Sequence, residues 1–221
     1  MRKLLASLAI SLSATGAAHA ASLAQADAAT GAAHAASLAQ ADAAAGGDKA
    51  AACAACHGQQ GVGITPAFPN LAGQQASYLA KQIMDIRDGN RQVPQMAGQV
   101  DGFSDQDAWD VAAYYAGMEP ALGQADPDPA LVERGRELYR AGDMEKGLPA
   151  CAACHTPTGA GIGSAVYPAL SGQQRDYVVS TLQAFAAGER ANDPSAIMRD
   201  IAAKMSDRDM EAVANYVHGL H

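Results

Sequence analysis

All four cysteines of the chain belong to two identical five-residue motifs, Cys53-Ala-Ala-Cys56-His57 and Cys151-Ala-Ala-Cys154-His155. Cys-x-x-Cys-His is the attachment signature of c-type haem. The two thiols add across the vinyl groups of the porphyrin, and the following histidine supplies an axial nitrogen to the iron. Because the spacing fits one helical turn, the imidazole is held beside the iron. The motifs predict two covalently bound haem c groups per chain.

Two other kinds of site also use cysteine pairs. Structural zinc sites usually place their two pairs about 15 to 20 residues apart, whereas the pairs here begin at positions 53 and 151, 98 residues apart. Zinc also gives no reason for a histidine directly after each pair. Disulfide exchange of the thioredoxin type accompanies a βαβ pattern, which the sequence lacks. Both stay minor alternatives to haem attachment.

The region that follows each motif is duplicated. Pro69, Leu71 and the Gly-Gln-Gln segment 73–75 return in the same order as Pro168, Leu170 and 172–174, and the offset between copies grows from 98 to 102 residues along the chain. An ordered offset that slips at loops is typical of two copies of one domain. We predict domains over 46–118 and 131–221. The segment 119–130, rich in proline, glycine and aspartate, is predicted to be an exposed linker.

The second axial ligand of each iron should come from a residue that both copies contain. Of eight methionines, only Met96 and Met198 coincide between the copies, each eight residues before the serine that starts the last helix, on a loop after the middle helix. A thioether opposite an imidazole favours ferrous iron. We predict the iron ligands His57 with Met96 and His155 with Met198; the alternative is that the methionines fill the core.

The elements that position these residues are predicted to be helices. Apolar residues recur at helical spacing before Gly89 and Gly188, where a helix would stop. Ser104 and Ser206 are each followed three residues later by an aspartate, an acidic variant of the capping box that starts a last helix. A helix is also predicted over about 129–141, with a shorter counterpart around 48–53. No run of alternating β-branched residues occurs, so the fold class is all-α.

Composition indicates that side chains alone do not fill the core. The chain of 221 residues is 49% hydrophobic, but Leu, Ile, Val and Phe make up only about 16% because alanine supplies most of that share. Domains of this size seldom fold without a metal or cofactor as a staple. The net charge of −8, without a basic cluster, argues against binding of nucleic acid.

The amino-terminal residues predict export. Arg2 and Lys3 precede an apolar stretch that is too short to span a bilayer, and Ala-His-Ala sites end at Ala20 and Ala35. We predict a signal peptide over 1–20, with cleavage as late as Ala35 as the alternative. Residues 14–28 recur identically as 29–43, and the alanine-rich segment 21–45 is predicted to be disordered. The mature protein is expected in the periplasm.

The chain resembles the dihaem cytochrome c4 family over about residues 46–221, through both Cys-x-x-Cys-His motifs, the Pro-x-Leu-x-Gly-Gln-Gln segments and the closing Ser-Asp helices. The resemblance implies two tandem class I cytochrome c domains related by a pseudo-twofold axis, with the haem propionate edges facing each other. It further implies that the carbonyls of Pro69 and Pro168 accept a hydrogen bond from His57 and His155. Members of the family carry electrons and are not enzymes.

By this resemblance the protein is expected to shuttle electrons between the quinol:cytochrome c oxidoreductase and a haem-copper terminal oxidase or another acceptor. It would be a monomer, associated with the membrane only through its partners. Two rivals stay open, a dihaem peroxidase-like enzyme and a cytochrome subunit of a dehydrogenase or oxidase complex. The peroxidase is disfavoured because an enzyme acting at haem needs an open coordination position, and both copies contain a methionine ligand.

Three further sets of residues allow two interpretations. Arg91 and Arg190 recur and either neutralise haem propionates or lie on a solvated surface. Trp109 has no counterpart in the second copy, so helix packing is favoured over a contact with a partner. The recurring tyrosines pack near the porphyrin or between helices, and we assign them no redox role; they are Tyr78, Tyr177, Tyr114 and Tyr216.

Overall fold

A computed structural model describes residues 32–221 of the chain. The predicted signal peptide 1–20 and the first part of the alanine-rich segment lie outside the described residues. Within the described range the secondary structure is helical apart from two isolated β-bridges, Asp143 with Leu148 and Ile162 with Tyr167. The prediction of an all-α fold is therefore confirmed. No helix in this range has the length and apolar character needed to cross a membrane.

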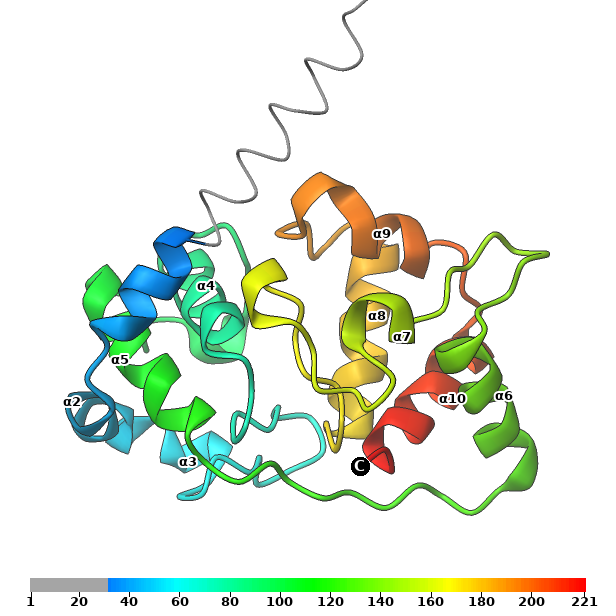
Figure 1. The fold of residues 1–221 in the computed structure, drawn as a ribbon, viewed down its shortest axis with the longest axis horizontal. Coiled ribbons are helices and arrows are strands. Elements are labelled where there is room, and N and C mark those ends of the chain that lie inside the picture. Colours follow the sequence, from blue (N-terminus) through cyan, green and yellow to red (C-terminus); the bar gives the residue numbers. More distant parts are fainter. Residues whose placement is uncertain (1–31) are drawn as a thin grey trace, which may run out of the picture.

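The first domain is built on three helices around the first motif. They are α2 (Ala43–Lys49), α4 (Ala76–Arg87) and α5 (Asp105–Ala116), with the short helix α3 (Ala54–His57) and the 3-10 turns η1 (Ala50–Ala52) and η2 (Pro94–Met96) between them. Helix α5 packs against both α2 and α4 (Figure 1). As predicted, α4 ends just before Gly89, which has a positive φ of 76°, and Ser104 caps α5 in a capping box with Asp107.

The second domain repeats this arrangement. Its helices are α6 (Pro129–Arg140), α7 (Ala152–His155), α8 (Arg175–Ala186), α9 (Ile197–Ala202) and α10 (Asp207–His218), with the 3-10 turns η3 (Gly163–Ala165) and η4 (Pro194–Ala196). Helix α10 packs against α6 and α8 as α5 packs against α2 and α4. Ser206 and Asp209 form the second capping box. Both predicted boxes are thus present.

A glycine allows the first and last helices of each domain to cross closely. A Cβ atom at Gly46 of α2 would lie 2.0 Å from the carbonyl oxygen of Asp110, and one at Gly135 of α6 would lie 2.2 Å from that of Ala212. Neither position can accept a side chain without a shift of the backbone. The two crossings are equivalent, which shows at the level of packing that the domains are copies of one fold.

Each domain has its own hydrophobic core. In the first, Tyr115 and Trp109 pack with Leu79 among several alanines. In the second, Tyr139 packs with Phe185 and larger aliphatic residues. Trp109 is 6% exposed and belongs to the core of its own domain, so the helix-packing interpretation of this residue is confirmed.

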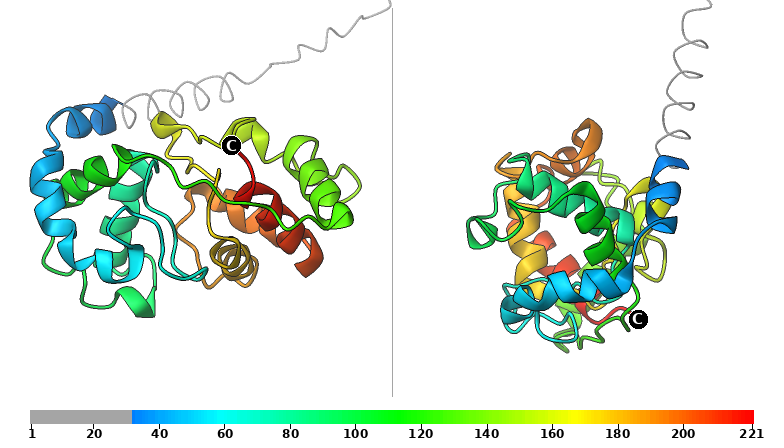
Figure 2. Two further views of the ribbon diagram at one scale, coloured as in Figure 1. Left: turned by 90° about the horizontal axis from the view of Figure 1, so that it is seen from below. Right: turned by 90° about the vertical axis from the view of Figure 1, so that its left-hand side faces the viewer.

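The two domains lie side by side, and residues 117–128 run between them without a helix (Figures 1 and 2). Helix α6 begins at Pro129, so it includes the last two residues of the predicted linker. The linker is fixed near its end because the side-chain amide of Asn215 accepts a hydrogen bond from the Asp126 N–H at 2.7 Å and donates one to the Asp126 carbonyl at 3.2 Å.

The prediction of disorder over 21–45 is wrong for its described part. Residues 32–39 are helical and α2 begins at Ala43. The carboxylate of Asp42 accepts hydrogen bonds from the N–H groups of Ala44 and Ala45, and its own N–H donates to the Asp110 carboxylate at 2.9 Å. Composition suggests disorder here, but a helix cap and a contact 68 residues away order the chain.

Candidate haem-binding sites

The two Cys-x-x-Cys-His motifs occupy equivalent single helical turns. Helices α3 and α7 each begin directly after the first cysteine of a motif and end at its histidine. The backbone N–H of the histidine donates to the backbone carbonyl of that cysteine, His57 to Cys53 and His155 to Cys151, both at 2.9 Å. One turn of helix therefore places both thiols and the imidazole of each motif close together, as the spacing predicts.

The imidazoles of both motifs are buried and oriented by a backbone carbonyl. Nδ1 of His57 donates to the carbonyl of Pro69 at 3.0 Å, and Nδ1 of His155 donates to that of Pro168 at 2.9 Å. These two hydrogen bonds confirm the contacts that the family resemblance implied. A carbonyl oxygen can only accept, so Nδ1 carries the proton and the lone pair of Nε2 is left for another partner.

Burial keeps these imidazoles neutral. Each histidine is 7% exposed, and burial lowers the pKa of His57 and of His155, opposed in part by the hydrogen bond to the carbonyl of Pro69 or Pro168. A neutral imidazole with a free Nε2 is the form that binds a metal ion. The donor set therefore fits an iron-porphyrin with one histidine ligand per domain.

The motif cysteines form no disulfide within the described residues, and the first thiol of each motif is not poised as a thiolate. Burial raises the pKa of Cys151 to about 11 and raises that of Cys53 above its usual range. Redox-active cysteines need a lowered pKa, because the thiolate is the nucleophile in disulfide exchange. The thioredoxin-like alternative is therefore contradicted by the surroundings of the cysteines.

The paired methionines occupy corresponding segments with different local structure. Met96 is the last residue of η2 and is half-buried. Met198 is also half-buried, but it lies in the first turn of α9 and packs against the core of the second domain. The prediction of a loop is therefore wrong for Met198. The stretch from Arg190 to Met198 is three residues longer than that from Arg91 to Met96. In the second copy the 3-10 turn η4 is followed directly by α9, whereas the first copy has only the 3-10 turn η2.

Two arginines each form a hydrogen bond to a tyrosine of the opposite domain. Arg91 donates to the hydroxyl of Tyr177 at 3.2 Å, and Arg190 donates to the hydroxyl of Tyr78 at 3.0 Å. Each arginine thus contacts the tyrosine of the other domain, at positions that match between the copies. Reciprocal contacts of this kind are what a pseudo-twofold axis produces.

This cluster is positively charged, and Arg190 is its buried arginine, whereas Arg91 and both tyrosines are half-buried. Arg190 is 8% exposed and lies 4.5 Å from the ring centre of Phe185, so its interpretation as a solvated surface residue is wrong. Both guanidinium groups also donate to the neutral amide oxygen of Gln82. Burial would raise the pKa of Tyr177, but the charges of Arg91 and Arg190 outweigh it and lower that pKa. Such a cluster favours a nearby anion.

Sequence reasoning missed the role of the glutamines at the domain boundary. Gln74 and Gln173, both 6% exposed, make hydrogen bonds to the opposite domain. The repeated Gly-Gln-Gln segment was the available signal, since a polar pair kept in both copies suggests a common task. Its partner could not be read from the sequence because the contacts join residues 95 and 103 positions apart.

Comparisons with known proteins place both halves of the chain among cytochromes. Residues 40–114 match the family described as "Cytochrome C oxidase, cbb3-type, subunit III", and residues 132–221 match the family described as "Cytochrome c". Two cytochrome c domains, each with one Cys-x-x-Cys-His motif, carry two covalently bound haem c groups, as predicted.

Individual relatives cover much or all of the chain. Cytochrome c4 of Pseudomonas aeruginosa is 46% identical, with 100% of both chains aligned. The crystal structure of reduced recombinant cytochrome c4 from Pseudomonas stutzeri has a TM-score of 0.79 at 44% identity, covering 82% of this chain and 100% of that one. A thiosulfate dehydrogenase electron acceptor of Thiomonas intermedia is 38% identical over 74% of this chain and 76% of its own.

Proposed function

Because the chain belongs to the cytochrome c4 family of dihaem electron-transfer proteins, we propose that it shuttles electrons in the periplasm from a quinol:cytochrome c oxidoreductase to a terminal oxidase or another acceptor. It carries out no substrate chemistry of its own. The observation that carries the proposal is the equivalence of the two histidines. Each is buried, donates through Nδ1 to a proline carbonyl and keeps Nε2 free.

His57 with Met96 and His155 with Met198 are the proposed iron ligands, and the four motif cysteines hold the porphyrins covalently. Bound haem would supply one-electron exchange between ferrous and ferric iron. The chain's own residues fix the imidazoles, and their burial excludes water from the histidine side. With a methionine on the other side, neither domain offers an open position to a substrate, which suits a carrier better than an enzyme.

Arg91 and Arg190 are the residues that would neutralise haem propionates. Their guanidinium groups lie at the domain boundary among neutral hydrogen-bond partners, so a nearby carboxylate would complete the cluster electrostatically. This supports an arrangement in which both haem edges face the boundary. Electrons could then pass between the domains over a short path.

Export and partner choice follow from features outside these sites. The predicted signal peptide ends at Ala20 or Ala35, and the net charge of −8 would not steer the protein to acidic partners. Docking would rely on local patches or exposed haem edges. Amino-terminal sequencing of the exported protein tests the first point, since the mature chain should begin at Ala21 or Ala36 and should be recovered from the periplasm.

The ligand assignment is tested by visible and near-infrared spectra of the purified protein and of two variants. The wild-type protein should contain two haems per chain, show the far-red band of methionine-ligated ferric haem, and not bind carbon monoxide or cyanide. Met96→Ala and Met198→Ala should each remove about half of that band and open one haem per chain to carbon monoxide. Met144→Ala is the matched control, because Met144 is 86% exposed and its loss should change neither property.

A second candidate is that of an electron acceptor for a dehydrogenase, as a diffusing protein or a bound subunit. The similarity to a thiosulfate dehydrogenase electron acceptor supports it. Co-purification of a stable catalytic partner would favour it over the respiratory shuttle. Rapid peroxide turnover by the pure protein, or a wild-type haem that binds carbon monoxide, would instead establish the enzyme rival.

A further inference from the structure

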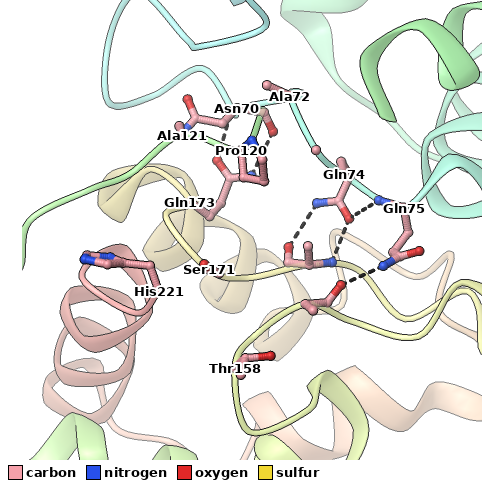
Figure 3. A pocket seen from close by; sticks show the side chains of 13 residues that line it. Asn70, Ala72, Gln74, Gln75, Pro120, Ala121, Thr158, Ser171, Gln173 and His221 are labelled. Carbon is pink, nitrogen blue, oxygen red and sulfur yellow. Dashed lines mark hydrogen bonds between the residues drawn. The ribbon is translucent and has the colours of Figure 1, made fainter. Parts of the chain in front are cut away.

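The first glutamine of each Gly-Gln-Gln segment forms two hydrogen bonds to the backbone of a single residue in the opposite domain. Oε1 of Gln173 accepts from the N–H of Asn70 at 2.8 Å, and its Nε2 donates to the Asn70 carbonyl at 3.0 Å. Gln74 makes the same pair of bonds to Ala169, at 2.7 and 2.9 Å. The dashed lines of Figure 3 follow these bonds around a pocket of about 310 Å³ at the domain boundary.

The orientation of both amides is fixed by a third bond. Oε1 of Gln74 also accepts from the N–H of Gln75, and Oε1 of Gln173 accepts from that of Gln174, both at 2.9 Å. Two backbone donors therefore converge on each side-chain oxygen, and an amide turned the other way would point its own donors at them. These glutamines are held rigidly and are not adjustable surface groups.

The peptide group that donates to each glutamine is the one that orients a proximal histidine. The Pro69 carbonyl and the Asn70 N–H belong to one planar peptide group. His57 donates to its oxygen, and Gln173 accepts from its nitrogen. In the other half the Pro168–Ala169 peptide connects His155 to Gln74. Each imidazole is thus linked through one peptide to an amide of the opposite domain.

Hydrogen bonds in such a chain polarise one another. A peptide whose N–H donates to an amide oxygen has a more negative carbonyl, which accepts more strongly from the imidazole Nδ1–H. A stronger bond at Nδ1 raises the basicity of Nε2 and so favours ferric over ferrous iron. We propose that Gln74 and Gln173 are positioning residues that tune the proximal histidine of the opposite domain, each lowering the reduction potential of the haem it does not itself carry.

This inference rests on the proposed function, in that His57 and His155 are taken as iron ligands. Its test is a redox titration of the purified dihaem protein followed by proton NMR, which resolves the two haems. Gln173→Met keeps the side-chain volume but removes the bonds. The one-electron equilibrium constant for reduction of the first haem should increase about threefold. At 59 mV per tenfold, this raises its reduction potential by about 28 mV. The potential of the second haem should not change.

The reciprocal variant Gln74→Met should shift only the second haem, and it carries the same test if Gln173→Met does not fold. The Nδ1–H resonance of the affected histidine should move toward that of a weaker hydrogen bond, a change that loosened packing alone would not confine to one haem. Gln75→Met is the matched control. Gln75 also donates across the boundary, to the Ala160 carbonyl at 2.7 Å, but its side chain does not contact either proline peptide.

The outcomes separate the inference from the function beneath it. A shift of the haem in the variant's own domain, an equal shift of both haems, an equal effect of Gln75→Met, or no shift would each overturn the cross-domain assignment. If the wild-type protein lacks histidine-ligated haem, the proposed function fails instead, and this is seen in the spectra before any variant is made.

Discussion

The two domains share a design but differ at the residues that adjoin each haem motif. After His57 the chain turns at Gly58, with φ 71° and ψ 158°, whereas after His155 it makes the same turn with a threonine, Thr156, at φ 67° and ψ 156°. This region of backbone space is almost confined to glycine. The second domain therefore stores strain beside its histidine that the first does not.

The peptides beside the histidines differ too. Asn70 of the first domain uses its side chain as well, donating to the Gly172 carbonyl at 2.9 Å and accepting from the Gly63 N–H at 3.0 Å, whereas Ala169 in the second domain has no side-chain bonds to offer. The first site is therefore held by more contacts across the boundary. If both irons have the proposed histidine and methionine ligands, we expect these unequal surroundings to give the two haems different reduction potentials.

We expect the largest loss of stability, and an equal loss in both domains, from substitution of the glycines at the helix crossings. Gly46→Ala and Gly135→Ala should each lower the free energy of unfolding by about 3 kcal/mol, because the added methyl group meets a backbone carbonyl that cannot turn away. Urea titration of the dihaem protein measures this. Gly102→Ala is a control, since no atom lies within 4 Å of a Cβ at that position. Tolerance of alanine at only one crossing would break the equivalence of the domains.

Removing the charge of the capping aspartate should destabilise the protein more at the last helix of the second domain, α10, than at that of the first, α5. Asp209 has a side chain 4% exposed and paired with Arg134 and Lys146, whereas the side chain of Asp107 is 25% exposed and paired with Lys49 at 3.0 Å. Asp209→Asn should cost about 2 kcal/mol, the size of charged hydrogen bonds, and Asp107→Asn distinctly less. Equal losses in urea titrations of the two variants would contradict this ranking.

The same pair predicts a dependence on pH. Burial would raise the pKa of Asp209, but hydrogen bonds from Lys146, Ser206 and Arg134 lower it overall. Hydrogen bonds from Ser104 and Lys49 lower the pKa of Asp107 to about 2. A lowered carboxyl pKa stabilises the fold above the unfolded value near 4, and this contribution is lost as the pH falls through the folded value. Asp209→Asn should flatten the fall in stability between about pH 4 and 2.

The smallest effect is expected from a substitution at the turn after the second histidine. Thr156→Gly should stabilise the second domain by about 1 kcal/mol, because relief of the backbone strain exceeds the loss of the bond that Thr156 Oγ1 accepts from the Ala160 N–H. The converse change Gly58→Ala should destabilise, since a Cβ there would lie 2.3 Å from the Val62 carbonyl oxygen. A loss of stability in Thr156→Gly would show that the hydroxyl bond matters more than the strain.

The sequence by itself determined the local structure and the chemistry of this protein. The haem motifs, the helices that stop before Gly89 and Gly188 and the capping boxes at Ser104 and Ser206 depend on residues a few positions apart, so spacing was enough to predict them. Among eight methionines, the internal repeat selected Met96 and Met198, which occupy equivalent positions of the two copies, as the predicted iron ligands. That assignment stays a prediction.

Tertiary structure decided what happens between the two copies. Arg91 and Arg190 form hydrogen bonds to tyrosines of the opposite domain. Gln74 and Gln173 form hydrogen bonds to the backbone beside the prolines of the opposite domain. All these contacts join residues from 86 to 112 positions apart. No local pattern specifies such partners, because each depends on how two finished domains pack. Order at residues 40–45 arose in the same way, from contacts with α5 that composition cannot indicate.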